Sequence, residues 1–137
     1  MRLDETTCRE RFAAARVARL ATAGQDRQPH IVPVTFAVFG ETIVTAVDQK
    51  PKTTMSLRRL RNIAENPSVS LLADHYADDW SQLWWVRADG VARTIEDDGA
   101  RQSAIRALAN KYAQYRDDPP RGPVVEIGVR SWRGWSY

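Results

Sequence analysis

The sequence predicts a mainly β domain of the α+β class, in which six antiparallel strands form a barrel-like sheet with flanking helices. Six short segments are rich in β-branched and aromatic residues. Most of them are joined by turn-forming residues, whereas a parallel sheet would need a helix between nearly every pair of strands. Helical patterns occur at three places only. The sequence also lacks the Gly-x-Gly-x-x-Gly pattern of a Rossmann fold.

The three predicted helices begin and end at recognisable signals. The first covers residues 4–15, with Asp4 or Thr6 as its N-cap and Phe12 as its large apolar contact. The second covers about 56–65 and is closed by an Asn-Pro pair. The third begins at Asp97 or Asp98 and continues to about residue 115, with apolar side chains at helical spacing.

The six predicted strands follow from alternation and from the turns between them. Pro33 removes one ladder hydrogen bond from the second strand, so a bulge or an edge position is expected there. A Gly-Glu pair makes a tight hairpin between the second and third strands. The expected strands cover residues 17–23, 30–39, 42–47, 68–75, 83–93 and 124–129.

Length and composition are those of one globular domain, expected to span residues 1–137. Hydrophobic residues make up 43% and charged residues 27% of the chain, and no apolar run is long enough to cross a membrane. The first ten residues are charged where a secretory signal needs an apolar core. Cys8 is the only cysteine, so no internal disulfide forms. We therefore expect a cytoplasmic protein.

Charge is distributed unevenly, although the net charge is only +3. Five cations fall between residues 50 and 61, with Asp48 as the one nearby acid, whereas acidic groups cluster around residues 74–79 and 96–98. This pattern favours a local site for a multiply charged anion over a general nucleic-acid surface, and a solvated basic loop is the alternative. The five cations are Lys50, Lys52, Arg58, Arg59 and Arg61.

Side chains that carry chemistry are few. The two histidines, His30 and His75, are 45 positions apart and belong to no metal-spaced set, so no metal is expected. No nucleophile elbow, phosphate-binding loop or zinc-protease motif occurs, and no catalytic residue is assigned. If the protein is an enzyme, a bound cofactor supplies the difficult chemistry.

The order of four segments resembles the pyridoxamine 5′-phosphate oxidase-like (PPOX class) split β-barrel family. Together they are similar to its actinobacterial branch, which uses the deazaflavin coenzyme F420. The resemblance covers residues 17–129 and implies an FMN-binding type of split barrel. It also implies a homodimer with two cofactor sites at the subunit interface, each built from both chains. The segments are Gln28-Pro-His-Ile-Val-Pro-Val-Thr-Phe36, Thr45-Ala-Val-Asp-Gln-Lys-Pro-Lys52, Leu60-Arg-Asn-Ile-Ala-Glu-Asn-Pro-Ser-Val-Ser-Leu-Leu72 and Asp74-His-Tyr-Ala-Asp-Asp-Trp-Ser-Gln-Leu-Trp-Trp-Val-Arg87.

The resemblance assigns the basic segment to the cofactor's tail. Lys50 and Lys52 would hold the phosphate, and Arg58 or Arg61 would lie near the acidic glutamates. A deazaflavin tail carries a phosphodiester and several carboxylates, so five cations favour it over FMN.

The resemblance places the ring of the cofactor along the second strand. Val32 and Val34 would pack against the ring, and His30 would either hydrogen-bond the cofactor or serve the structure alone. Thr45 and Ala46 would pass beneath the ribityl chain.

Tryptophans gather in the fifth predicted strand. Adjacent strand residues point to opposite faces, so Trp84 and Trp85 cannot share one. Trp85 and Arg87 share parity, and we expect both to face the site. Trp132 and Trp135 could close it.

The predicted function is hydride transfer from reduced F420 to a small conjugated substrate by a homodimeric oxidoreductase. An FMN-dependent oxidase or reductase of the same fold and a non-catalytic F420- or flavin-binding carrier are the alternatives. Neither nucleic acid nor a membrane is an expected partner.

Overall fold

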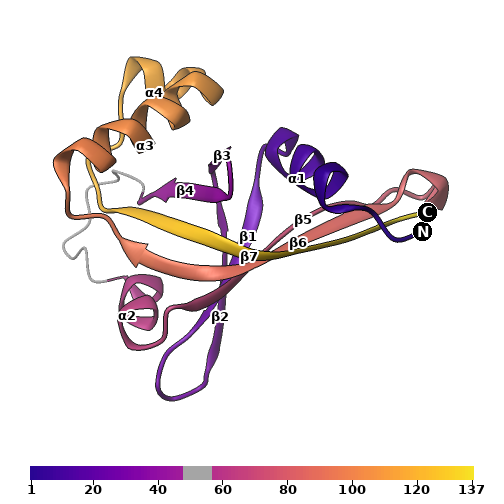
Figure 1. Ribbon diagram of the computed structural model, residues 1–137, viewed down its shortest axis with the longest axis horizontal. Coiled ribbons are helices and arrows are strands. Elements are labelled where there is room, and N and C mark those ends of the chain that lie inside the picture. The colour runs from indigo at the N-terminus through magenta and orange to yellow at the C-terminus, as the bar shows by residue number, and fades with distance from the viewer. Residues whose placement is uncertain (48–56) are drawn as a thin grey trace.

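The computed structural model describes residues 1–47 and 57–137 of the chain. In them a single antiparallel sheet of seven strands has the order β2-β1-β5-β6-β7-β4-β3. The sheet curls into a half-barrel (Figure 1), which confirms the mainly β, split-barrel class. The strands are β1 (Ala18–Ala23), β2 (Pro29–Val34), β3 (Ala37–Phe39), β4 (Thr42–Ala46), β5 (Ser68–His75), β6 (Trp84–Thr94) and β7 (Val124–Ser136).

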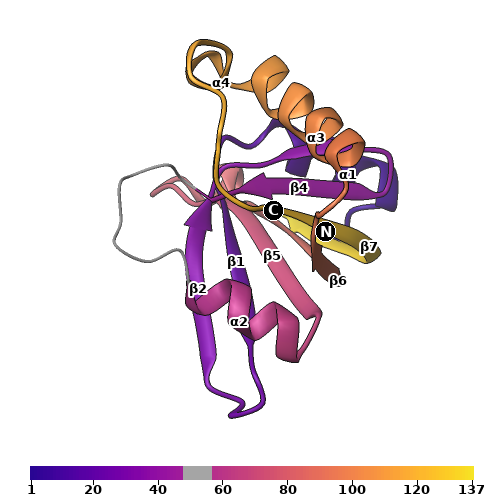
Figure 2. The ribbon, with the colours of Figure 1, turned by 90° about the vertical axis from the view of Figure 1, so that its left-hand side faces the viewer.

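In the described ranges, four α-helices and one short 3₁₀ helix flank the sheet. Figure 2 shows α2 lying across the strands at one end of the half-barrel and α3 over β4 at the other, in agreement with their contacts. No helix in the described parts of the chain is long and apolar enough to cross a membrane. The helices are α1 (Glu5–Ala14), α2 (Arg58–Glu65), α3 (Asp98–Lys111), α4 (Ala113–Asp117) and η1 (Trp80–Gln82).

Helix α1 begins at its predicted cap and fills the core through its predicted aromatic residue. The Asp4 carboxylate accepts a hydrogen bond from the Thr7 amide at 2.7 Å. Phe12 is fully buried, with its ring centroid 4.8 Å from that of Phe36 and 5.4 Å from that of Trp132. Trp132 is therefore a core residue of β7, and the prediction that it could close a site is not supported by its position.

The segment predicted as one strand over residues 30–39 forms two strands, so the prediction of six strands is wrong. β2 and β3 are the two opposite edges of the curled sheet, joined by Thr35 and Phe36. The Thr35 carbonyl accepts from Thr45 Oγ1 at 2.7 Å, and the Phe36 amide donates to Tyr112 Oη at 3.1 Å. These bonds to distant residues take the place of ladder bonds. Pro33 lies in edge strand β2, as expected.

The predicted helix over 97–115 is likewise interrupted, at Tyr112. The backbone of Tyr112 is extended. The buried hydroxyl of Tyr112 donates to the Arg16 carbonyl at 2.9 Å and accepts from the Phe36 amide. Because this side chain fastens α3 to the start of β1 and β3, the helix ends at Lys111 and α4 begins a new turn.

The last strand continues seven residues beyond its predicted end at 129, because it pairs with β6 as far as Ser136. Strands β5, β6 and β7 thus form a long arm (Figure 1). The N-terminal segment joins its edge, where the Leu3 amide donates to the Gly134 carbonyl at 3.0 Å. Trp135 lies on this arm, where it is paired with Trp85.

The amine of Lys111 makes the stability of this fold pH-dependent. Burial, aided by the charge of Arg16, lowers its pKa from 10.5 to about 8. Between these values the unfolded chain binds more protons, so stability rises as the pH rises from 8 toward 10.5. Lys111 is half-buried, and we expect a rise of about 1 kcal/mol after allowing for solvent screening.

Lys111→Met should flatten this rise, as measured by urea unfolding at pH 7.5, 9 and 10. Arg106→Met, on the exposed face of the same helix, is the matched control and should keep it. Equal pH slopes in the two variants would contradict the assignment.

Candidate functional site

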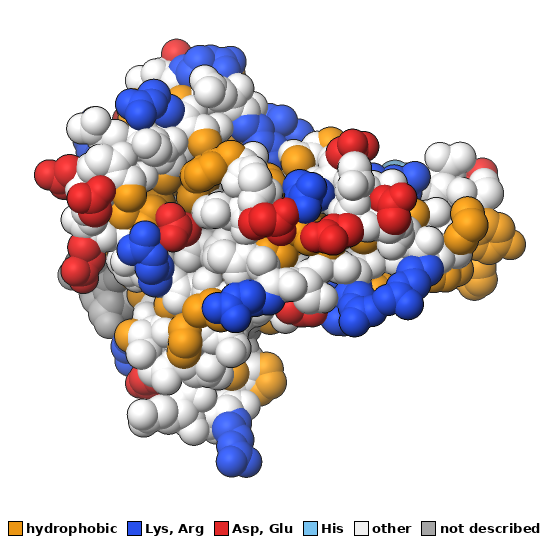
Figure 3. All heavy atoms as spheres, in the orientation of Figure 1, with side chains coloured by type: hydrophobic (Ala, Val, Ile, Leu, Met, Phe, Trp, Pro, Cys, Tyr) orange, Lys and Arg blue, Asp and Glu red, His pale blue; other side chains and the backbone are white. Residues whose placement is uncertain are grey.

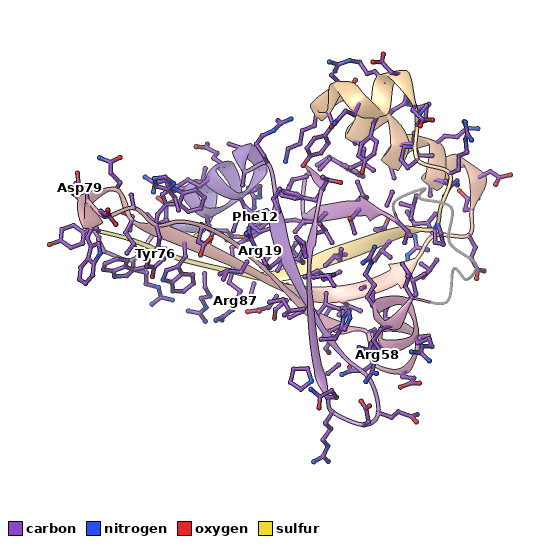
Figure 4. All side chains as sticks on the ribbon, turned by 180° about the vertical axis from the view of Figure 1, so that it is seen from behind. Phe12, Arg19, Arg58, Tyr76, Asp79 and Arg87 are labelled. Carbon is purple, nitrogen blue, oxygen red and sulfur yellow. The ribbon has the colours of Figure 1, made fainter. Side chains whose placement is uncertain are left out.

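A cleft of about 460 Å³ opens on the outer face of the sheet, opposite the core. β1, β2, β5 and β6 contribute to it. In Figure 4, Arg19, Arg87 and Tyr76 lie on this side of the molecule. The lining combines two guanidinium groups with aromatic and aliphatic surface: Arg19, Ala21, Ile31, Ser70, Leu71, Leu72, Asp74, Tyr76, Trp85 and Arg87.

Strand register orders the side chains of this face into rows. Arg19 is paired with Leu72, Leu72 with Arg87, and Arg87 with Arg133. Neighbouring strands lie about 4.8 Å apart, so this row crosses four strands and places three arginines on one line. We call it the arginine row.

The row beside it is aromatic and acidic. It consists of Asp74, Trp85 and Trp135 on β5, β6 and β7. Trp85 stands two residues from Arg87 on the same strand face, so the cleft has an aromatic side and a cationic side.

Arg87 is held in place by its neighbours on the same face. Its Nε donates to Asp89 at 3.0 Å, and Ser70 Oγ donates to the same carboxylate at 2.7 Å. Because only Nε is used, the two terminal amino groups of Arg87 have no partner within residues 1–47 and 57–137. A guanidinium held through Nε can bind an anion with these two amino groups.

The prediction that Trp85 and Arg87 share a face agrees with their positions, since both line the cleft. Trp84 points the other way and packs against the core, with the Arg11 guanidinium 5.7 Å from its ring centroid. The cofactor contacts assigned to Trp85 and Arg87 remain predictions.

From β2, the residue that reaches the cleft is Ile31, which is 63% exposed. Val34 is buried in the core and Val32 packs against it, because even-numbered residues of this strand point inward. A ring in the cleft would meet Ile31 rather than these two valines. The contact predicted for Val32 and Val34 therefore has no support from their positions.

His30 shares the inward face of β2. Its Nδ1 is buried and accepts or donates no hydrogen bond within the described part of the chain. A cofactor contact and a purely structural role both stay predictions for His30.

Thr45 and Ala46 end β4 on the far side of the half-barrel from the cleft. Thr45 is 4% exposed and its hydroxyl donates to Thr35, whereas Ala46 packs against the apolar cluster beneath α3. Both positions lead directly into the basic segment, of which Lys50 and Lys52 lie outside the described residues.

Arg58 opens α2. Its guanidinium donates to Asp26 at 2.8 Å, and Nε to Asn62 Oδ1 at 3.4 Å. The buried Asn62 amide donates in turn to Thr22 Oγ1 at 3.0 Å and fastens α2 to β1. In Figure 4, Arg58 lies across the β1–β2 hairpin from Arg87.

The predicted site residues within the described ranges come from different parts of the fold. Thr45 and Ala46 end β4, and Arg58 begins α2. Trp85 and Arg87 line the cleft on the outer face.

Several lining residues of the cleft escaped the sequence prediction. Arg19, Ile31 and Tyr76 line it but were not predicted as site residues, although strand alternation could have placed Arg19 and Ile31 outward. A second hollow of about 510 Å³ adjoins the cleft and shares Ala21 and Ser70 with it.

The arm that bears this face ends in exposed aromatic groups. Figure 3 shows basic side chains along one edge of the arm and hydrophobic side chains at its tip. The large exposed aromatic residues include Tyr76, Trp80, Trp135 and Tyr137.

Within the described residues, no group of three or more His, Cys, Asp or Glu side chains could hold a metal ion.

Solved structures with the same fold include proteins of several kinds. The FAD binding protein of Mycobacterium smegmatis is 23% identical, with a TM-score of 0.74, over 100% of this chain and 98% of that one. A conserved hypothetical protein of Mycobacterium tuberculosis is 22% identical, with a TM-score of 0.79, over 98% and 85%. The heme storage protein HutZ of Vibrio cholerae is 16% identical, with a TM-score of 0.73, over 96% and 93%.

At these identities the similarity shows the fold alone. No curated protein matches the sequence. A family model, described as pyridoxamine 5′-phosphate oxidase, matches residues 5–136, which is nearly the whole chain. The half-barrel, the outer-face cleft and this match together lead to one conclusion: the chain belongs to the pyridoxamine 5′-phosphate oxidase family.

Proposed function

We propose that the protein is a homodimeric oxidoreductase that uses reduced coenzyme F420 to reduce a small conjugated molecule. The proposal rests above all on the five cations between residues 50 and 61. FMN has a single phosphate, whereas the F420 tail carries a phosphodiester and several carboxylates, which match a larger number of cations.

The residues of the outer face fit a flat ring bound beside an anion. Trp85 and Ile31 offer apolar surface, and Arg87 offers two terminal amino groups that have no partner among the described residues. In the homodimer that we propose, the basic segment of one protomer and the outer face of its partner would enclose one cofactor. Lys50 and Lys52 would hold the tail.

When bound, the deazaflavin supplies hydride chemistry, and the protein supplies orientation and electrostatics. Trp85 would limit the tilt of the ring and cover it from water. Asp89 and Ser70 keep the Arg87 guanidinium in a fixed direction. Its positive charge would therefore be in position to stabilise an anionic group of the bound cofactor.

Cofactor choice is tested by titrating the purified protein with F420 and with FMN and following the quenching of cofactor fluorescence. We expect F420 to bind at least tenfold more tightly than FMN. The family to which the chain belongs favours FMN as the second candidate. A yellow protein that releases FMN on denaturation, or tighter binding of FMN, would overturn the choice of F420.

Lys52→Ala should weaken F420 binding at least tenfold, because it removes a charge-assisted hydrogen bond to phosphate worth about 1.5 kcal/mol or more. The same titration measures it. Arg106→Ala, an exposed cation on α3, is the control and should bind as the wild type does. Equal affinity of the two variants would remove Lys52 from the site.

A further inference from the structure

A separate cavity of about 440 Å³ lies beside the edge of β7, at a gap in the pairing of that edge. The N-terminal segment pairs with the edge through Leu3, and on the other side of the gap the Val129 amide donates to the Glu41 carbonyl at 2.8 Å. Residues 130–133 lie between these contacts and line the cavity, together with residues 2–5, where the chain leaves the edge and enters α1. The cavity shares no lining residue with the cleft on the outer face.

Three of the eight residues that line this cavity are arginines. The side chains of Arg2, Arg130 and Arg133 make no hydrogen bond or ion pair with residues 1–47 or 57–137. Because all three border one cavity, their long side chains can reach a common ligand there. Like charges brought together in this way repel each other unless an anion joins them.

The two acids of the cavity are engaged elsewhere. The Asp4 carboxylate accepts from the Thr7 amide at 2.7 Å and so caps α1. The Glu5 carboxylate accepts from the Arg9 guanidinium at 3.5 Å. Neither acid forms an ion pair with the three arginines, so the guanidinium groups stay available to a ligand.

Backbone and indole N–H groups add further donors at the same place. Helix α1 begins at Glu5, and the amides of Glu5 and Thr6 have no acceptor among the described residues. These amides and the helix dipole favour an anion at this end of α1. Trp132 lines the cavity from β7, is 8% exposed, and has a buried Nε1 without a partner in the described part of the chain.

A phosphate group matches this set of donors better than a carboxylate does. One guanidinium in bidentate geometry satisfies a carboxylate, whereas a phosphate monoester has three terminal oxygens and carries about two negative charges at neutral pH. The cavity is also larger than a bare ion needs. Its 440 Å³ falls in the range of small-molecule sites, roughly 300–1,000 Å³, and leaves room for an organic group beside the phosphate.

We propose that this cavity binds the phosphate group of a small phosphate monoester, held by Arg2, Arg130 and Arg133 beside the N-terminal end of α1. The site is distinct from the proposed cofactor site, and the proposal does not depend on the identity of the cofactor.

Isothermal titration calorimetry of the full chain with phenyl phosphate, benzoate and inorganic phosphate tests the class of ligand. We expect phenyl phosphate to bind about tenfold more tightly than benzoate, because only the phosphate engages several guanidinium groups. Inorganic phosphate should bind more weakly than phenyl phosphate. Equal affinity for phenyl phosphate and benzoate would overturn the proposal, and so would equal affinity for the ester and the free ion.

Charge variants of the lining residues test the place of binding. Arg2→Gln and Arg130→Gln should each lower the affinity for phenyl phosphate about tenfold. Glu5→Gln should raise it about threefold, because it removes a negative charge from the same cavity. Arg106→Gln, an exposed cation on α3, should leave it unchanged. Wild-type affinity in both lining arginine variants would refute the site.

Lys52→Ala separates this cavity from the basic segment, which could also attract a phosphate. The tighter phenyl phosphate site should persist in Lys52→Ala protein, and F420 affinity should be unchanged in Arg130→Gln protein. If Lys52→Ala abolishes phenyl phosphate binding and Arg130→Gln does not weaken it, the basic segment holds the phosphate and the proposal is wrong.

Nuclear magnetic resonance provides a readout that locates the ligand directly. In ¹H–¹⁵N spectra of the labelled protein, the amide signals of Glu5 and Thr6 should shift as phenyl phosphate is added. The same addition to Arg130→Gln protein should shift them much less. Signals of Glu5 and Thr6 that stay in place while the ester binds would contradict a site at this end of α1.

Discussion

The Gly90→Ala variant should lose about 3 kcal/mol of its free energy of unfolding, as measured by urea denaturation. A Cβ at this position would lie 2.4 Å from the Gly128 carbonyl oxygen and 2.9 Å from Ile127 Cγ2. The first of these atoms belongs to the backbone of the adjacent strand. It cannot move aside without breaking the pairing of β6 with β7.

Gly128→Ala is the matched control, because the two glycines lie on the same pair of strands. The nearest atom to a Cβ at Gly128 is the Val91 carbonyl oxygen, 4.0 Å away, which is ordinary contact. This variant should be as stable as the wild type or slightly more so, since alanine loses less backbone entropy on folding. Equal denaturation midpoints for the two variants would contradict the close approach at Gly90.

The same glycine affects the candidate site. Asp89 is paired with Ser131 and Gly90 with Val129, so the register between β6 and β7 shifts at this point. Asp89 is the residue that fixes the Arg87 guanidinium. Folded Gly90→Ala protein should therefore also bind F420 more weakly, because the carboxylate that orients Arg87 is displaced.

Local signals in the sequence were sufficient for the elements whose limits depend on neighbours along the chain. Asp4 caps α1 and Phe12 anchors it, as the pattern of residues 4–15 predicts. Alternation in the fifth predicted strand correctly separated Trp84 from Trp85 and grouped Trp85 with Arg87. These features need no information from distant residues.

The ends of strands and helices that depend on contacts with distant residues could not be predicted from local signals. The break at Thr35 and Phe36 depends on Tyr112, which is 76 positions from Phe36 and also ends α3. Residues 130–136 contain two tryptophans but also two arginines and one glycine, and they were not predicted as strand, yet pairing with β6 keeps them extended. Both cases reflect hydrogen bonds that only the assembled sheet provides.

In the candidate site, too, local signals predicted some residues and missed those that depend on the assembled sheet. Strand parity identified the outward residues Trp85 and Arg87, but it did not reveal that Val34 belongs to the core and that Ile31 reaches the cleft. For β2 the apolar residues occupy both faces, so alternation alone gave no direction. The arginine row became visible only once register placed Arg19 opposite Leu72.

A heterodimer of Lys52→Ala and Trp85→Ala protomers should recover about half of the wild-type number of tight F420 sites, although each parent homodimer has none. If each site takes its basic segment from one chain and its outer face from the partner, one site of the heterodimer carries both substitutions. The other then carries neither. Two different affinity tags allow the heterodimer to be isolated, and fluorescence titration counts its sites.

The reciprocal pairing distinguishes this arrangement from a site built within one chain. In a heterodimer of wild-type and Lys52→Ala/Trp85→Ala protomers, shared sites each contain one substitution, so no tight site should remain. Sites formed within single chains would give the opposite pattern, with one tight site here and none in the first heterodimer. Because Arg58 and Arg87 lie on opposite sides of the β1–β2 hairpin, we expect the shared pattern (Figure 4).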